Sequence, residues 1–199
     1  MSAIPPDDYW YDVFISYSRS GVIMPWVINY LHPRLSGWLR EELGREVRLF
    51  LDEQELSGNE HWPEGIRDRL VHSKCLLPVL SGRYFFSDWC LSEWSNFVSR
   101  EELLGLRDRK ESLIVPALYH DGEKFRREIE RYIPFDFREC RSDSPNFENH
   151  ASYPLFERTV ERLAKAVAAV VEQPLDFDPT WPALEFRADR PSIPLMTPA

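Results

Sequence analysis

The sequence contains few cysteines and no long apolar run. Its three cysteines, Cys75, Cys90 and Cys140, are an odd number among 199 residues and lack metal-ligand spacing. Neither a disulfide framework nor a zinc site is therefore indicated, and a reducing compartment fits best. No segment approaches the roughly 20 apolar residues of a membrane-spanning helix, and the N-terminus lacks a signal-peptide pattern. We expect a cytoplasmic protein that does not bind membranes.

The sequence also has fewer basic than acidic residues. Lysine and arginine number 24 against 33 aspartates and glutamates, so the net charge is -9. This balance argues against a nucleic-acid partner bound by phosphate neutralisation. No Walker-type or G-x-G-x-x-G loop occurs, so no resident nucleotide cofactor is expected. The five histidines are scattered without zinc spacing, and no metal is expected either.

Apolar residues are plentiful enough for one sizeable core, with 43% hydrophobic and 14% aromatic residues. Compact apolar runs bounded by polar residues indicate buried parallel strands. The expected strands are Asp12–Ser18, Val47–Leu51, Cys75–Leu80, Leu113–Tyr119 and a possible edge strand at Phe135–Phe137. Apolar residues at helical spacing alternate with these runs. The expected helices are Trp26–Leu43, one opened by Trp62 and Pro63, Trp89–Leu104, Phe125–Tyr132 and Tyr153–Glu172.

Two residues should shape the first helix. Pro33 is expected to kink or divide it near His32, because proline has no backbone N–H. Gly44 is expected to end it in a C-terminal cap.

Strands alternating with helices imply an α/β fold with a mainly parallel sheet that is covered on both faces. In such sheets the ligand crevice lies beyond the carboxyl ends of the strands. The segments expected there are Ser16–Gly21, Asp52–His61 and Ser81–Trp89. Residues 174–199 are rich in proline and are expected to form an extended tail. Four apolar residues could hold that tail against the domain surface: Phe177, Trp181, Leu184 and Phe186.

Four stretches, in order and at matching spacing, resemble the Toll/interleukin-1 receptor (TIR) family. They are YDVFISYSR (Tyr11–Arg19), VRLFLDEQELSG (Val47–Gly58), SKCLLPVLS (Ser73–Ser81) and WCLSEW (Trp89–Trp94). The resemblance covers about residues 9–173, the expected TIR domain, which a lead of residues 1–8 precedes and the tail of residues 174–199 follows. It implies a flavodoxin-like three-layer sandwich around a five-stranded parallel sheet of order 2-1-3-4-5.

Some TIR domains are scaffolds for signalling complexes, and others cleave the nicotinamide–ribose bond of NAD⁺. The cleaving members carry a glutamate four residues after a tryptophan, and Trp89 and Glu93 match that spacing. Positions i and i+4 share one helix face, which would set an aromatic plane beside a catalytic carboxylate. Such a carboxylate can stabilise a ribose that becomes cationic as nicotinamide leaves. The resemblance therefore implies a bacterial-type TIR NAD⁺ hydrolase or ADP-ribosyl cyclase in antiphage signalling or NAD depletion.

The resemblance implies two further groups of functional residues. The substrate-binding residues would be Trp89 together with four residues at the end of the first strand: Ser16, Tyr17, Ser18 and Arg19. A loop after the second strand would dock one TIR domain against another, through Asp52, Glu53, Glu55, Leu56 and Gly58. The expected partners are NAD⁺ as a substrate, further copies of the TIR domain, and a separate sensor or effector protein.

Each of these assignments has a plainer alternative. Glu93 is also consistent with a solvated carboxylate on a helix surface, Trp89 with a core side chain, and Arg19 with a surface cation. The main alternative function is a catalytically silent TIR adaptor that acts by homotypic assembly. A third possibility is an enzyme similar to nucleoside deoxyribosyltransferases, with a glutamate nucleophile. The sequence leaves the product, the activating trigger and the oligomer geometry open.

Overall fold

The computed structural model describes residues 8–18, 22–51, 64–109, 111–121 and 129–181. Five parallel strands form one sheet in the order β2-β1-β3-β4-β5, as the sequence predicts. The strands are β1 (Tyr11–Tyr17), β2 (Leu49–Leu51), β3 (Ser73–Leu80), β4 (Ala117–Leu118) and β5 (Phe135–Asp136). β1 and β3 are buried along almost their whole length, because helices cover both faces of the sheet.

The fourth strand is shorter than the predicted run Leu113–Tyr119. Only β4 itself pairs with both neighbouring strands, and Ile114 makes a separate bridge to Leu76. Pro116 lies between the two pairings and has no N–H to donate to the ladder, which accounts for the interruption. The run is buried throughout, so the prediction located the core segment while the proline limited its pairing.

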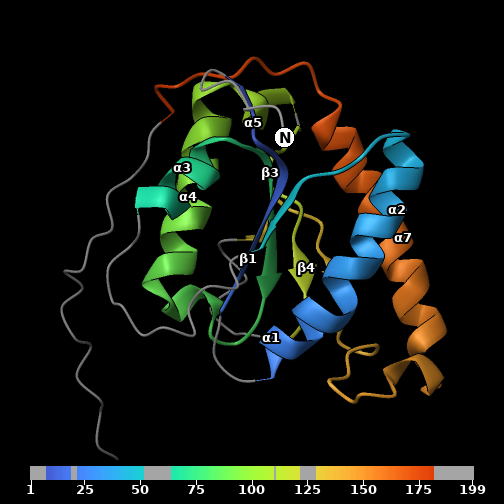
Figure 1. Ribbon diagram of the computed structural model, residues 1–199. Coiled ribbons are helices and arrows are strands. Elements are labelled where there is room, and N and C mark those ends of the chain that lie inside the picture. The colour runs from blue at the N-terminus through green and yellow to red at the C-terminus, as the bar shows by residue number, and fades with distance from the viewer. Residues whose placement is uncertain (1–7, 19–21, 52–63, 110, 122–128, 182–199) are drawn as a thin grey trace, which may run out of the picture.

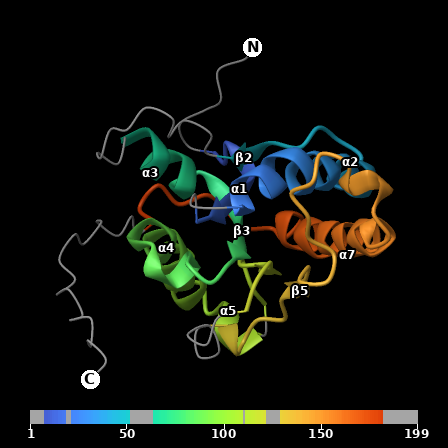
Figure 2. The same cartoon turned by 90° about the horizontal axis from the view of Figure 1, so that it is seen from below.

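Two layers of helices enclose the sheet (Figures 1 and 2). One layer contains α1 (Ile23–Trp26), the π-helical turn η1 (Val27–Leu31), α2 (His32–Leu43) and α7 (Tyr153–Val171). The other contains α3 (Glu64–Val71) and α4 (Asp88–Leu103), with the short α5 (Leu106–Arg109) after α4. The arrangement is the predicted three-layer sandwich.

The first helical segment confirms the prediction about Pro33. The segment begins at Ile23, ahead of the predicted start, makes the π-helical turn η1, and continues as an α-helix from His32. Pro33 cannot donate a hydrogen bond to the preceding turn, and a π-helical turn is a local rearrangement that accommodates such a loss. Gly44 ends α2 at φ +61°, with its N–H bonded to the carbonyl of Arg40, which is the predicted left-handed cap.

The bounds of the later helices agree closely with those predicted from the sequence. α4 is displaced by one residue from the predicted span Trp89–Leu104, and α7 ends just before the predicted Glu172. Trp62 and Pro63 lie outside the described residues, and so does the first half of the predicted helix Phe125–Tyr132. Within the described ranges, no helix combines the length and the apolar character needed to cross a bilayer.

The segment after α7 packs against Tyr9 at the start of the domain, His72 just after α3, and Arg100 in the last turn of α4. The Phe177 ring stacks on His72 at 4.6 Å, and His72 in turn stacks on Trp10 at 3.8 Å. Trp181 is 7% exposed and lies over the guanidinium of Arg100. These contacts confirm the expectation that Phe177 and Trp181 hold the tail against the surface; Leu184 and Phe186 lie outside the described residues.

Candidate functional site

A buried chain of three polar side chains lies at the carboxyl end of β1. The Ser16 hydroxyl donates to Oε2 of Glu93 over 2.5 Å, and its oxygen lies 2.7 Å from the phenolic oxygen of Tyr84. Because Ser16 has a single hydroxyl hydrogen, Tyr84 is the donor in the second bond. The chain therefore runs from Tyr84 through Ser16 to Glu93, whose exposed fractions are 0%, 1% and 4%.

The three members of this chain come from three different elements. Ser16 belongs to β1, Tyr84 opens the 3-10 turn η3 (Tyr84–Phe86), and Glu93 lies in the second turn of α4. α4 begins after Ser87 because the Ser87 side chain accepts a backbone N–H of the first turn. This N-cap fixes where the helix begins, and Glu93 in the second turn bonds to the strand.

Burial fixes which groups donate and which accept along the hydrogen bonds from Tyr84 to Glu93. It raises the pKa of the Tyr84 phenol well above its usual value, and the nearby Cys90 and Glu93 raise that pKa further. The hydrogen bond with Ser16 lowers it, with a smaller effect. The phenol therefore keeps its proton at neutral pH and remains the donor. Hydrogen bonds arranged in series at low dielectric strengthen one another, so the chain orients Ser16 toward the carboxylate.

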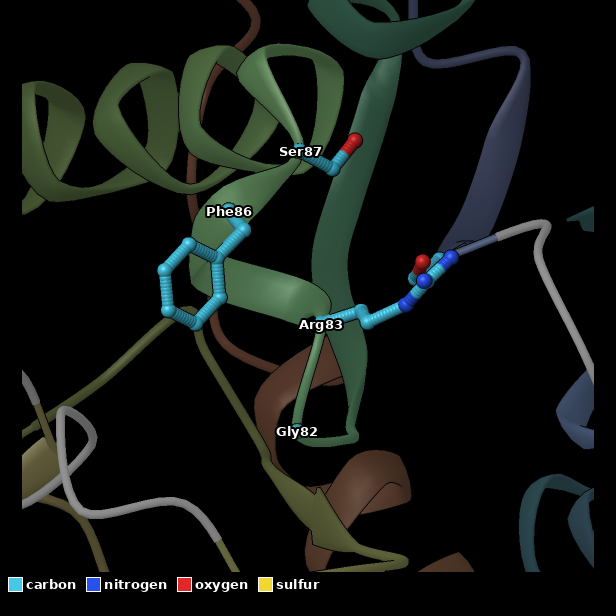
Figure 3. A pocket seen from close by; sticks show the side chains of 5 residues that line it. Gly82, Arg83, Phe86 and Ser87 are labelled. Carbon is cyan, nitrogen blue, oxygen red and sulfur yellow. The ribbon is translucent and has the colours of Figure 1, made fainter. Parts of the chain in front are cut away.

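A cleft of about 440 Å³ opens at the same end of the sheet (Figure 3). Its described lining residues are Ser18, Gly82, Arg83, Phe86 and Ser87. The Arg83 side chain extends from the loop after β3 toward the end of β1 (Figure 3), and the Phe86 side chain is 60% exposed. One cation, one exposed aromatic ring and two hydroxyls suit a ligand that is both anionic and aromatic.

The residues predicted at the end of the first strand have three different surroundings. Ser16 contacts Glu93 directly, Tyr17 is 5% exposed and belongs to the core, and Ser18 lines the cleft. Arg19 lies outside the described residues. The whole predicted assembly loop also lies outside them: Asp52, Glu53, Glu55, Leu56 and Gly58.

Trp89 and Glu93 lie one turn apart on α4, as their spacing requires, but in different surroundings. Glu93 is buried against β1, whereas Trp89 is half-buried. Neither residue is among the described residues that line the cleft. The alternative interpretation of Glu93 as a solvated surface carboxylate is wrong, because only 4% of this residue is exposed.

Sequence reasoning selected the segment Ser81–Trp89 for the crevice but singled out no residue before Trp89. The tripeptide Tyr84–Phe86 shows why. Its three aromatic residues are equivalent as local patterns, yet the structure leaves exposed fractions of 0%, 6% and 60% along it. The position of Arg83, just after a buried strand, was the available signal for a ligand contact. In the part of the chain that the structure describes, no group of three or more His, Cys, Asp or Glu side chains could hold a metal ion.

A parallel sheet of order 2-1-3-4-5 between two helical layers, with a cleft at its carboxyl edge, defines the flavodoxin-like class. The sequence model of the TIR domain matches residues 13–151, and the chain belongs to this family. None of the curated protein sequences matches the chain.

Two solved structures are similar to the chain. One is the TIR domain of the Toll-related receptor TRR-2 from Hydra magnipapillata, with 22% identity and a TM-score of 0.41. That match covers 78% of this chain and 98% of the other. The second comprises the TIR domains of the activated Roq1 resistosome, which directly recognises the pathogen effector XopQ; identity is 19% and the TM-score 0.36. It covers 82% of this chain and 84% of the other.

Proposed function

We propose that this TIR domain cleaves the nicotinamide–ribose bond of NAD⁺, with Glu93 as the catalytic carboxylate. The observation that carries the proposal is the bond from Ser16 to Glu93, which holds a carboxylate at the carboxyl edge of a parallel sheet. A cleft with a cation and an exposed aromatic ring opens at the same edge. The combination suits a substrate that carries phosphates, aromatic bases and a sugar.

The chemistry requires one carboxylate and no general acid. Nicotinamide leaves with the electron pair of the carbon–nitrogen bond, which neutralises its own positive charge and leaves the ribose cationic. The negative carboxylate of Glu93 stabilises that developing charge in a water-poor setting, where electrostatic stabilisation is strongest. In hydrolysis, a water oxygen then bonds to the sugar carbon and releases a proton to solvent. In cyclisation, a nitrogen of the adenine takes the place of water.

The buried state of Glu93 assigns a role to Ser16. In this proposal a ribose hydroxyl replaces the Ser16 hydroxyl as the donor to the carboxylate. Exchanging one hydroxyl donor for another keeps the carboxylate hydrogen-bonded, so the exchange has a small net cost. Trp89, one turn earlier on α4, then supplies an aromatic surface to the nicotinamide or adenine ring once the substrate opens this contact.

The proposal includes a biological setting. We place the chain with the bacterial NAD-cleaving TIR domains, acting in the cytoplasm in antiphage signalling or NAD depletion. Copies of the domain would associate through the loop that contains Asp52, Glu53, Glu55, Leu56 and Gly58, and a separate sensor or effector protein would trigger the assembly.

The test compares nicotinamide release from NAD⁺ by the wild-type chain and by Glu93→Gln at high protein concentration. The substitution keeps the side-chain shape and removes the charge, so the rate should fall by about 100-fold or more. Glu102→Gln changes an exposed carboxylate on the same helix and should leave the rate within about twofold. Equal rates for wild type and Glu93→Gln, or no release by wild type even when crowded, would refute the proposal.

A second candidate function is a TIR adaptor that assembles without catalysis. The observation that favours it is the inward orientation of Glu93, which bonds to the strand and is not among the described cleft residues. An adaptor would self-associate equally well with and without the Glu93 carboxylate and would release no nicotinamide. Sedimentation of both proteins, combined with the release assay, separates the two functions.

A further inference from the structure

A second, smaller hollow adjoins the cleft and shares two of its residues, Gly82 and Arg83. Its volume is about 220 Å³. Its other lining residues come from the ends of three elements: Val22, Ile23, Ser81, Tyr119 and His120. The loop after β3 thus forms a common wall, with the cleft on the β1 and α4 side and the smaller hollow on the β4 side.

The walls of the smaller hollow are suited to a flat apolar ring. Val22 is 58% exposed there, and the Tyr119 ring contacts Trp26, with the ring centroids 5.0 Å apart, while the Arg141 guanidinium lies over the Tyr119 ring at 5.1 Å. Val22 in this hollow and Phe86 in the cleft are two of the four large hydrophobic side chains that are exposed in the described part of the chain. Each hollow therefore offers its own apolar contact.

Arg83 is the cation that the two hollows share. Its side chain is exposed and makes no hydrogen bond or ion pair with any residue in the described ranges, while its backbone carbonyl accepts from the N–H of Phe86. Several other arginines are paired with carboxylates, as Arg45 is with Asp12 and Arg138 is with Asp136. An unpaired guanidinium suits bidentate binding of phosphate oxygens, and Arg83 is the arginine that lines both hollows.

We propose that the two hollows bind the two halves of one dinucleotide and that Arg83 binds the pyrophosphate that joins them. The adenine half occupies the smaller hollow, since about 220 Å³ is below the range of roughly 300–1,000 Å³ for complete ligand sites and suits one base of a larger ligand. The other half occupies the cleft, next to the strand and helix that carry Ser16 and Glu93. Its identity as nicotinamide riboside rests on the proposed NAD⁺ cleavage.

This arrangement has a consequence for the product. A dinucleotide that spans the Gly82–Arg83 wall is extended, and its adenine lies on the far side of the wall from the reacting sugar carbon. Water rather than an adenine nitrogen then reaches that carbon, so linear ADP-ribose is the expected product. A predominantly cyclic product would overturn the extended arrangement.

The binding test uses calorimetry of the full chain with two probes, ADP-ribose and nicotinamide mononucleotide. Arg83→Gln should weaken ADP-ribose binding by about tenfold to hundredfold, the range for hydrogen bonds to a charged group. Val22→Trp fills the smaller hollow from an exposed position and should weaken ADP-ribose by about tenfold while leaving nicotinamide mononucleotide unchanged. The matched controls are Arg109→Gln and Ile133→Trp, at exposed positions outside both hollows.

The inference is overturned if ADP-ribose does not bind, if both variants bind it as the wild type does, or if Val22→Trp weakens both probes equally. Its failure is distinguishable from failure of the proposed function, which is measured by nicotinamide release. Binding that responds to Arg83 and Val22 without any NAD⁺ cleavage would keep the dinucleotide site and exclude the enzyme. Cleavage that requires Glu93 but is unchanged by Arg83→Gln and Val22→Trp would keep the enzyme and exclude the dinucleotide site.

Discussion

Ser16 and Glu93, 77 residues apart in the sequence, are joined by a 2.5 Å hydrogen bond between β1 and α4. The same serine oxygen accepts from Tyr84, so one hydroxyl connects the central strand, the turn η3 and the helix. All three side chains are almost fully buried, where a hydrogen bond that is lost is not replaced by water. This contact therefore contributes to stability, and the proposed chemistry requires that the substrate replace it.

Ser16→Ala should destabilise the fold more than Tyr84→Phe. The alanine removes a donor from buried Glu93 and an acceptor from Tyr84, at a cost of about 2–3 kcal/mol in the free energy of unfolding. The phenylalanine removes only the outer donor of the chain, at a cost of about 1 kcal/mol. Urea unfolding of both variants measures the difference. Equal costs would contradict a chain that runs from Tyr84 through Ser16 to the carboxylate.

Two glycine substitutions should have opposite effects. Gly44 has φ +61° in the cap of α2, and a Cβ there meets no atom within 4 Å, so Gly44→Ala should cost about 1 kcal/mol through backbone strain alone. Gly37 lies within α2 with open space around it, so Gly37→Ala should stabilise by about 0.5–1 kcal/mol. Thermal melting of the two variants provides the comparison. A fall in Tm for both would show that side-chain contacts, not backbone conformation, decide these positions.

The buried thiol of Cys140 should make stability fall in alkaline solution. Burial raises the pKa of this thiol to about 11, and the hydrogen bond with Thr159 offsets part of the effect. An unfolded cysteine ionises near 8.5, so the native state binds more protons than the unfolded state between about pH 8.5 and 11. The stabilisation is complete below about pH 8.5 and is lost as the pH rises through that window.

The check is the slope of the free energy of unfolding against pH, from pH 8 to 10, in the wild type and in Cys140→Ala. The variant loses some packing energy at every pH, but its decline should be shallower because one titrating group is absent. Parallel slopes would mean that Cys140 does not contribute to the alkaline loss of stability.

The contact between Trp181 and Arg100 should stabilise the domain. Arg100 is 1% exposed, donates to the carbonyls of Ser73 and Leu70, and has its pKa lowered to about 10 by burial. Trp181 lies over its guanidinium at 5.6 Å and is itself 7% exposed. Trp181→Ala should reduce the free energy of unfolding by about 2–3 kcal/mol, from lost apolar burial and the lost cation–π contact.

Phe177→Ala is the companion variant, since Phe177 anchors the same segment through His72 and the edge of Tyr9. Chemical denaturation of both variants is the measurement. If Trp181→Ala unfolded at the wild-type denaturant concentration, the tail would be a passive covering and not part of the folded unit.

Local patterns were enough to locate most elements of this fold. A continuous apolar run predicts a buried strand wherever it occurs, which is why β1 and β3 appear where the sequence indicates. Pro33 and Gly44 act through their own backbone geometry, so their effects on α2 were also predictable. The order of the strands followed from the family resemblance and is confirmed.

By itself, then, the sequence determined the alternation of strands and helices and the positions at which the first helix is interrupted and ends. It also predicted the edge of the sheet at which the cleft lies. Only the tertiary structure decided that Glu93 turns inward to Ser16, that Tyr84 is buried while Phe86 is exposed, and that Arg83 divides two hollows. The physical reason is that spacing along a helix assigns residues to a common face, whereas the direction of that face depends on packing between elements far apart in the chain.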